Sequence, residues 1–206
     1  MKYINPSRFV LSVLFFSVVL SSIMAFADNS KTNISDNVLR LHVIANSNSP
    51  EDQSLKLKVR DRIISDANTL LVKAENKEDA LLSAKKNLSF LESSVHDELR
   101  KNGSTYDARV EIGSFDFPPK KYGKILLPAG NYNAVRVVIG DGTGKNWWCV
   151  MFPPLCFTNG TVELSEDCTA YLKSHLSKGE YSLITESAPD IELRFKTLDI
   201  LKNLFE

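Results

Sequence analysis

The sequence predicts an α+β fold: a mixed or antiparallel sheet of about four strands with two long helices packed on one face, plus a C-terminal amphipathic helix. Four segments show the β-branched content or the apolar-polar alternation that is typical of strands. Between the first of them and the other three lie two long segments whose apolar residues recur every three or four positions, which is the helical period. The chain has 206 residues, and we assign residues 38–206 to a single domain.

The first 27 residues have the composition of a secretory signal peptide. Lys2 and Arg8 precede an almost uncharged run that ends in Ala25-Phe26-Ala27, which matches the order of basic, apolar and small residues in such signals. We expect cleavage after Ala27 and export of the mature chain. The alternative is an uncleaved membrane anchor, because about 18 apolar residues can nearly span a bilayer. Residues 28–37 are polar and are expected to form a flexible lead-in.

The first strand is predicted at residues 38–45, VLRLHVIA. Leu39, Leu41 and Val43 would lie on one face of it, because side chains alternate along a strand. Arg40 and His42 would lie on the other face, which is therefore the more polar one.

The two helices follow this strand. In NSNSPEDQ, Ser49 has the place of an N-cap and Pro50 that of the first helical residue, so the first helix is predicted from there to about Val72. The second helix is predicted from Asn76 to about Arg100.

Three further strands are predicted in TYDARVEIG (105–113), YNAVRVVIG (132–140) and WWCVMF (147–152). The last two are expected to pair as a hairpin across GDGTGKN, because Asp-Gly is a strong hairpin signal. Beyond them we expect a short helix at about 165–177 and the amphipathic helix after Pro189.

No motif in the chain supports catalysis or a cofactor. Lys plus Arg and Asp plus Glu number 25 each, so net charge favours no nucleic-acid partner. GDGTGK lacks the spacing and the hydroxyl residue of a nucleotide-binding loop, and an aspartic protease would need a second Asp-Gly type of turn. His42, His96 and His175 have no nucleophile motif nearby. We predict no catalytic residue, no metal and no small-molecule cofactor.

The cysteines are spaced too widely for a structural zinc site, whose ligands come in close pairs. In an exported chain, disulfides are the commoner use of such thiols. Cys149 and Cys156 would close a small loop around the double proline, and pairing of Cys156 with Cys168 is the alternative.

The two tryptophans are neighbours on a predicted strand. Trp147 and Trp148 should therefore point to opposite faces of the sheet. If only one face is covered, only one of them can be fully buried, and the other is available to a partner.

Three stretches resemble the stage II sporulation protein R family of endospore-forming Firmicutes: RLHVIANSNSPEDQSLKLKVRD, GKNWWCVMFPPLCF and IELRFKTLDILKNLF. The resemblance implies a protein that is made in the forespore and exported into the space between the forespore and mother-cell membranes. There it would activate a membrane-embedded aspartic protease of the mother cell, which processes the sigma-E precursor. The chain would be an activating ligand near the membrane and not the catalyst.

Candidate partner-binding residues come from the polar face of the first strand, the turn after it, the first helix and the aromatic segment. They are Arg40, His42, Asn46, Ser47, Asp52, Arg60, Trp147, Trp148, Pro153 and Pro154. Helix capping is the alternative role for the NSNSPED turn. The alternative functions are a secreted hydrolase of peptide or cell wall and a structural protein of the septum or spore envelope.

Overall fold

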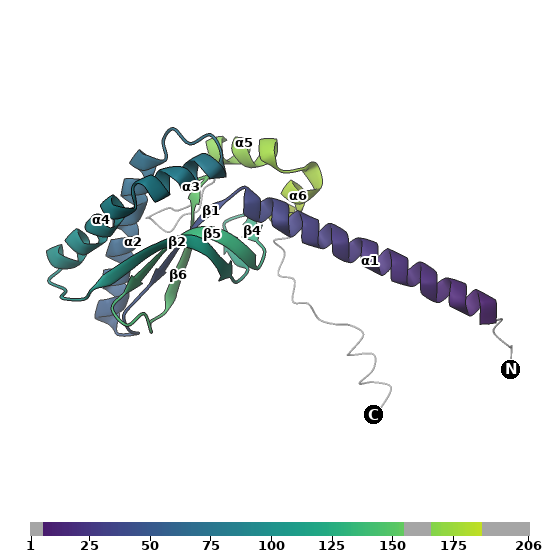
Figure 1. The fold of residues 1–206 in the computed structure, drawn as a ribbon, viewed down its shortest axis with the longest axis horizontal. Coiled ribbons are helices and arrows are strands. Elements are labelled where there is room, and N and C mark those ends of the chain that lie inside the picture. Colours follow the sequence, from purple (N-terminus) through teal and green to yellow (C-terminus); the bar gives the residue numbers. More distant parts are fainter. Residues whose placement is uncertain (1–5, 155–165, 187–206) are drawn as a thin grey trace, which may run out of the picture.

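The fold is built on a mixed four-stranded sheet, as the sequence predicts (Figure 1). The computed structural model describes residues 6–154 and 166–186. The strands of the sheet are β1 (Leu39–Ile44), β2 (Ala108–Phe117), β5 (Gly130–Ile139) and β6 (Asn146–Phe152). Their order is β2-β5-β1-β6, with β1 parallel to β5 and the other two neighbouring pairs antiparallel. Because β1 has neighbours on both sides, the first strand of the domain is a central one.

The predicted hairpin between β5 and β6 is wrong. β1 lies between these strands and pairs with both, and the loop that joins them crosses the end of β1. The amides of Thr143 and Gly144 donate there to the carbonyls of Asn46 and Ala45, at 3.1 and 2.9 Å. The Asp-Gly turn does form, with Gly142 at a φ of 64°, but it bends a crossing loop. Burial of the apolar strand β1 in the middle of the sheet outweighs the local hairpin signal.

Three helices pack on one face of the sheet: α2 (Pro50–Leu70), α3 (Lys77–Lys86) and α4 (Leu88–Lys101). α3 and α4 together occupy the segment predicted as one long second helix, which is interrupted at Asn87. The side chain of Asn87 donates to the carbonyl of Ser83 at 2.8 Å. Such side-chain bonds to the backbone compete with helical ones, which explains the break. The core on this face includes Leu41 and Val43 of β1 and Ile63 of α2, all fully buried.

The opposite face of the sheet is partly covered, whereas the sequence predicts helices on one face only. The cover consists of the end of α1 (Pro6–Asp36), the small sheet of β3 (Lys120–Tyr122) and β4 (Ile125–Leu127), α5 (Glu166–His175) and α6 (Lys178–Glu186). Together they bury a second core. The short strands β3 and β4 were not predicted from the sequence, since three residues show no readable period. Helix α5 confirms the short helix expected at about 165–177.

Helix α1 extends away from the domain at its amino-terminal end (Figure 1). Its large apolar side chains between Val10 and Met24 are exposed by 38 to 70%. Residues 28–36 continue the helix instead of forming a flexible lead-in. The reason is that Ile34 is buried in the second core and the Asn33 amide donates to Glu180 of α6 at 2.8 Å. Within the described residues, no helix combines the length and apolarity required of a membrane span.

The amphipathic helix expected after Pro189 lies outside the described residues. The last described helix is α6, which ends at Glu186. Its Ile184 side chain is buried in the second core.

Candidate functional site

The partly covered face of the sheet is divided by its rows of in-register residues. The row formed by Gly113, Ala134, Arg40 and Val150 borders the second core. Two further rows lie beyond the cover, and we call their eight residues the open half: Glu111, Arg136, His42 and Trp148 in the first row, and Arg109, Val138, Ile44 and Asn146 in the second. Arg109 and Asn146 are exposed, and the Glu111 and Arg136 side chains are 39% and 32% exposed. These four side chains are therefore accessible to a partner, whereas His42 and Val138 of the same rows are buried.

His42 and Trp148 form the centre of the open half. Their rings are stacked, with centroids 3.7 Å apart and an angle of 20° between the planes. Nε2 of His42 is 2.8 Å from Oδ1 of Asn146, and Trp148 meets the Phe117 ring edge-on at 4.7 Å. Burial, and then the positive charges of Arg136 and Arg40, lower the pKa of His42. The imidazole is held as a neutral ring against the indole.

Arg136 links this centre to the edge strand β2. Its Nε donates to the carboxylate of Glu111 at 2.9 Å, and its guanidinium lies over the Phe115 ring, 4.1 Å from the centroid. Glu111 and His42 are the cross-strand neighbours of Arg136 on either side. The row from Glu111 to Trp148 is thus a continuous polar and aromatic band across all four strands.

Arg40 lies next to this band but is fully buried. Its guanidinium is surrounded by the rings of Phe117, Tyr132 and Tyr122, with centroids at 4.0, 4.8 and 5.8 Å. One nitrogen donates to the hydroxyl of Tyr122 at 2.6 Å, while Nε and Nη1 have no hydrogen-bond partner. Burial lowers the pKa of Arg40. The sequence interpretation of Arg40 as a surface contact is wrong, because β3 and β4 cover it.

The NSNSPED turn has the structural role that the sequence offers as the alternative. Ser49 caps α2 by accepting the amide of Asp52 at 3.1 Å. The Asp52 carboxylate accepts from Ser47 at 2.6 Å and from Asn46 at 2.8 Å. These bonds, that of Ser47 first, lower the pKa of Asp52. The Asn46 side chain also accepts the amide of Asp141 at 3.0 Å. Asn46, Ser47 and Asp52 therefore join β1, α2 and the β5–β6 loop.

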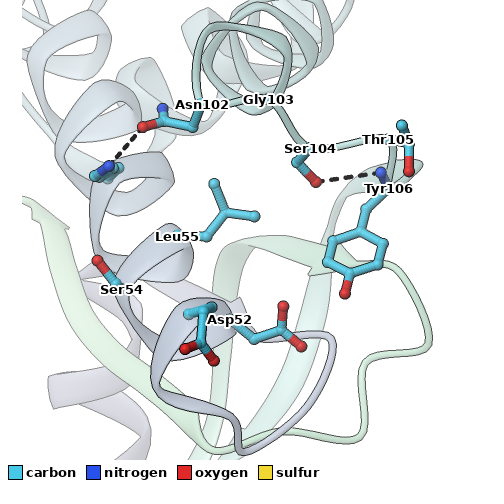
Figure 2. Close-up of a pocket in the computed structure, with 10 residues that line it drawn as sticks. Asp52, Ser54, Leu55, Asn102, Gly103, Ser104, Thr105 and Tyr106 are labelled. Atoms are coloured by element: carbon cyan, nitrogen blue, oxygen red, sulfur yellow. Dashed lines mark hydrogen bonds between the residues drawn. The ribbon is translucent and has the colours of Figure 1, made fainter.

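A shallow pocket of about 450 Å³ lies beside this turn, between the start of α2 and the segment after α4 (Figure 2). Asp52 and Leu55 line it on one side, and Ser104 and Tyr106 line it on the other. Figure 2 shows the Tyr106 hydroxyl directed toward the start of α2. The negative charge of Asp52 raises the pKa of Tyr106. The Asp52 carboxylate is used in the hydrogen bonds of the turn, so the pocket offers little chemistry of its own.

Trp147 and Trp148 point to opposite faces of the sheet, as predicted. Trp147 packs against the helix-covered core, where the guanidinium of Arg60 lies 4.2 Å from its ring centroid. Arg60 is also paired with Asp61 at 2.6 Å. Both tryptophans are half-buried, because both faces of the sheet have a core. Trp148, in the open half, is the one of the pair that lies beside accessible polar residues.

The remaining sequence candidates lie where β6 ends. Pro153 is buried and Pro154 is exposed. Cys149 is disulfide-bonded, Cys156 lies outside the described residues, and the Cys149–Cys156 pairing stays a prediction. Cys168 is a buried thiol, so its alternative pairing with Cys156 is wrong. Burial raises the pKa of the Cys168 thiol to about 12.

The arginines and the glutamate of the open half were not among the sequence candidates: Arg109, Arg136 and Glu111. The alternation of DARVEIG places Arg109 and Glu111 on one face of their strand, and this pattern was visible in the sequence. The pattern does not show which residues of the neighbouring strands lie beside Arg109 and Glu111. Arg136 lies between Glu111 and His42 only because β5 lies between β2 and β1.

The described residues contain no arrangement suited to catalysis. His42 is stacked on Trp148, and Nε2 of His96 on α4 is 3.7 Å from the carboxylate of Asp107, which directly precedes β2. His175 bonds within its own helix, to Tyr171 and Ser174. No group of three or more His, Cys, Asp or Glu side chains in the described part of the chain is placed to hold a metal ion.

Comparison with known proteins identifies the family to which the chain belongs. The family model described as stage II sporulation protein R matches residues 35–162. The stage II sporulation protein R of Bacillus subtilis (strain 168) is 31% identical over 197 residues, which cover 87% of this chain and 86% of that protein. No solved structure matches the chain. The family match spans all four strands of the main sheet, and the chain therefore belongs to the stage II sporulation protein R family of sporulation proteins.

Proposed function

We propose that this sporulation protein is an exported signal. It is made in the forespore, reaches the space between the forespore and mother-cell membranes, and activates the membrane-embedded aspartic protease of the mother cell that processes the sigma-E precursor. The observation that carries the proposal is the family match over residues 35–162, which contains the open half and with it an accessible surface for a partner.

Two features of the chain support this proposal. The first is the amino-terminal part of α1, whose exposed apolar side chains follow Lys2 and Arg8 as in an export signal. The second is the burial of Ile34 and Val38 in the second core. Cleavage after Ala27 would leave both residues in the mature chain, so the domain would keep the segment that its core requires.

Activation follows from preferential binding. A ligand shifts a conformational equilibrium only by the difference between its affinities for the two states. A shift from about 1% to 99% active protease requires a preference of about 10⁴-fold for the active form. The exported domain would supply this preference by binding the extracytoplasmic part of the protease more tightly in its active state.

Reconstitution in a host that does not sporulate tests the proposal. The full chain is co-expressed with the protease and the sigma-E precursor from the same organism, and processing is followed by immunoblot. Processing should appear with the full chain and disappear when residues 2–27 are deleted. An unrelated signal peptide in place of these residues should restore it. Processing by the deleted, cytoplasmic form would contradict the role of export, and absence of processing with the full chain would contradict activation.

A further inference from the structure

The open half carries an excess of positive charge. Arg109 is exposed on β2, and within the described residues it has no ion-pair partner. Arg136 is paired with Glu111, which is the only acidic residue of the open half. Arg40 in the adjacent row is a buried cation with two nitrogens that lack partners. Three guanidinium groups therefore lie near a single carboxylate, and this imbalance favours an acidic partner.

The border of the open half adds to this charge. The small sheet that covers Arg40 carries Lys120, Lys121 and, in its turn, Lys124, all of them exposed. Tyr122 of the same sheet is bonded to Arg40, which fixes this basic segment next to the row of Arg40. Burial lowers the pKa of His42 most, and the positive charges of Arg136 and Arg40 lower it further.

The exposed surface distinguishes between classes of acidic partner. A protein that inserts into an anionic bilayer presents large apolar side chains among its basic residues. The exposed large apolar residues of the described chain lie elsewhere: between Val10 and Met24 of α1, and at Val72, Leu82, Phe90, Tyr106 and Leu183. The open half instead has one half-buried indole, Trp148, which is stacked on His42 in the same row as Arg136 and Glu111. Aromatic and arginine side chains together are typical of protein–protein contacts.

We propose that the open half is the docking surface for an acidic segment of the partner protein. One carboxylate of that segment pairs with Arg109, and a second competes with Glu111 for Arg136. An apolar side chain of the segment packs on the accessible part of Trp148. The inference deepens the proposed function, on which it rests, by assigning an acidic segment to the extracytoplasmic part of the protease.

The pairing of Glu111 with Arg136 predicts that variants at Glu111 and Arg109 change binding in opposite directions. Because Glu111 occupies Arg136 internally, its removal leaves a cation ready for the partner, so Glu111→Gln should strengthen binding. Arg109→Glu should weaken it, since the new charge repels the acidic segment. A purely structural role of these residues would not give effects of opposite sign.

The experiment measures binding of the full chain, in detergent, to the purified protease on a sensor surface. Arg109→Glu should raise the dissociation constant roughly tenfold, and Glu111→Gln should lower it by a factor of about three. The matched control is Arg100→Glu on the helix-covered side, whose Arg100 side chain is 71% exposed, and it should bind like the parent chain. The difference between Arg109→Glu and the parent chain should shrink in high salt.

Each outcome decides between the two proposals. If the parent chain binds but Arg109→Glu and Arg100→Glu bind equally well, the docking surface is wrong and the proposed function stands. If Arg109→Glu weakens binding but the bound parent chain triggers no processing, the docking surface stands and the activating function is wrong. If the parent chain does not bind the protease, both are overturned. Binding to phosphatidylglycerol vesicles without protease that is lost in Arg109→Glu would assign the surface to a membrane instead.

Discussion

The imidazole of His42 is stacked on the indole of Trp148 across the β1–β6 pair, 3.7 Å from centroid to centroid. These residues are 106 positions apart in the chain, and the antiparallel register places them directly opposite each other. The stack joins the folding of the sheet to the shape of the open half, because the two rings meet only when β1 and β6 pair.

Replacement of Trp148 by alanine should lower the free energy of unfolding by about 3 kcal/mol, because it removes both the stack on His42 and the contact with Phe117. Trp148→Phe keeps a ring and should cost about 1 kcal/mol. Urea unfolding followed by circular dichroism measures both. Phe90→Ala on α4 is the control, since that ring is 47% exposed. Equal losses in Trp148→Ala and Phe90→Ala would contradict the stack as a stabilising element.

The lowered pKa of His42 makes stability dependent on pH. The unfolded chain has the ordinary histidine pKa of about 6.5, so between this pH and the lower folded pKa the unfolded state binds more protons. Stability contributed by neutral His42 is therefore complete above about pH 6.5 and is lost as the pH falls toward the folded pKa. Unfolding free energies between about pH 7 and pH 5 should fall less steeply in His42→Gln than in the parent chain.

Arg40 is a buried charge whose removal need not destabilise the domain. The double change Arg40→Met with Tyr122→Phe replaces an incompletely bonded guanidinium and its phenol partner by apolar groups of similar size. We expect the free energy of unfolding to stay equal or to rise by about 1 to 2 kcal/mol. Arg40→Ala opens a cavity and leaves the hydroxyl of Tyr122 without its donor, so it should lose about 2 kcal/mol or more. A larger loss in the double variant than in Arg40→Ala would show that the charge itself stabilises the fold.

Gly144 is required by the close approach of the β5–β6 loop to the end of β1. A Cβ at this position would overlap the backbone oxygen of Ser47 and lie 2.9 Å from the Cβ of Ala45. Gly144→Ala should therefore lower the free energy of unfolding by about 2 kcal/mol. Gly179→Ala is the matched control in α6, where a Cβ meets nothing within 4 Å, and it should raise that free energy by about 0.5 kcal/mol. Melting curves of the two variants should move in opposite directions.

The three cysteines should differ in their reaction with a thiol reagent. Cys168 is buried and its thiol pKa is raised to about 12, so the native protein should remain unlabelled at neutral pH. Denaturation without reductant should release one reactive thiol, and denaturation with reductant should release all three. Mass spectrometry of the oxidised peptides would then identify the partner of Cys149. Recovery of a peptide that links Cys149 to Cys168 would contradict the buried thiol.

The elements of this fold were predictable wherever a local signal decided them. Ser49 and Pro50 marked the start of α2, and alternation marked β2 and the opposite directions of Trp147 and Trp148. The strand order was not predictable, because Asp141-Gly142 is a hairpin signal that the chain uses for a crossing loop. The carbonyls that accept hydrogen bonds from this loop are at the end of β1, almost 100 residues earlier in the chain.

The candidate site was likewise predictable only where residues adjacent in the sequence decide its structure. Capping by the NSNSPED turn was predicted as an alternative, since it depends on adjacent residues. Arg40 and His42 were correctly placed on one polar face, but the cover over Arg40 comes from Tyr122 and its neighbours, in a three-residue strand without a recognisable pattern. Arg136 was overlooked because its importance arises only from the neighbours that the sheet supplies, Glu111 on one side and His42 on the other.

The central position of β1 has a consequence for the order of events during synthesis. This strand leaves the ribosome first among the four, yet its parallel neighbour begins at Gly130 and its antiparallel neighbour ends at Phe152. Loop closure over such separations is slow compared with local helix formation. A nascent chain therefore holds no finished sheet until its last strand has emerged.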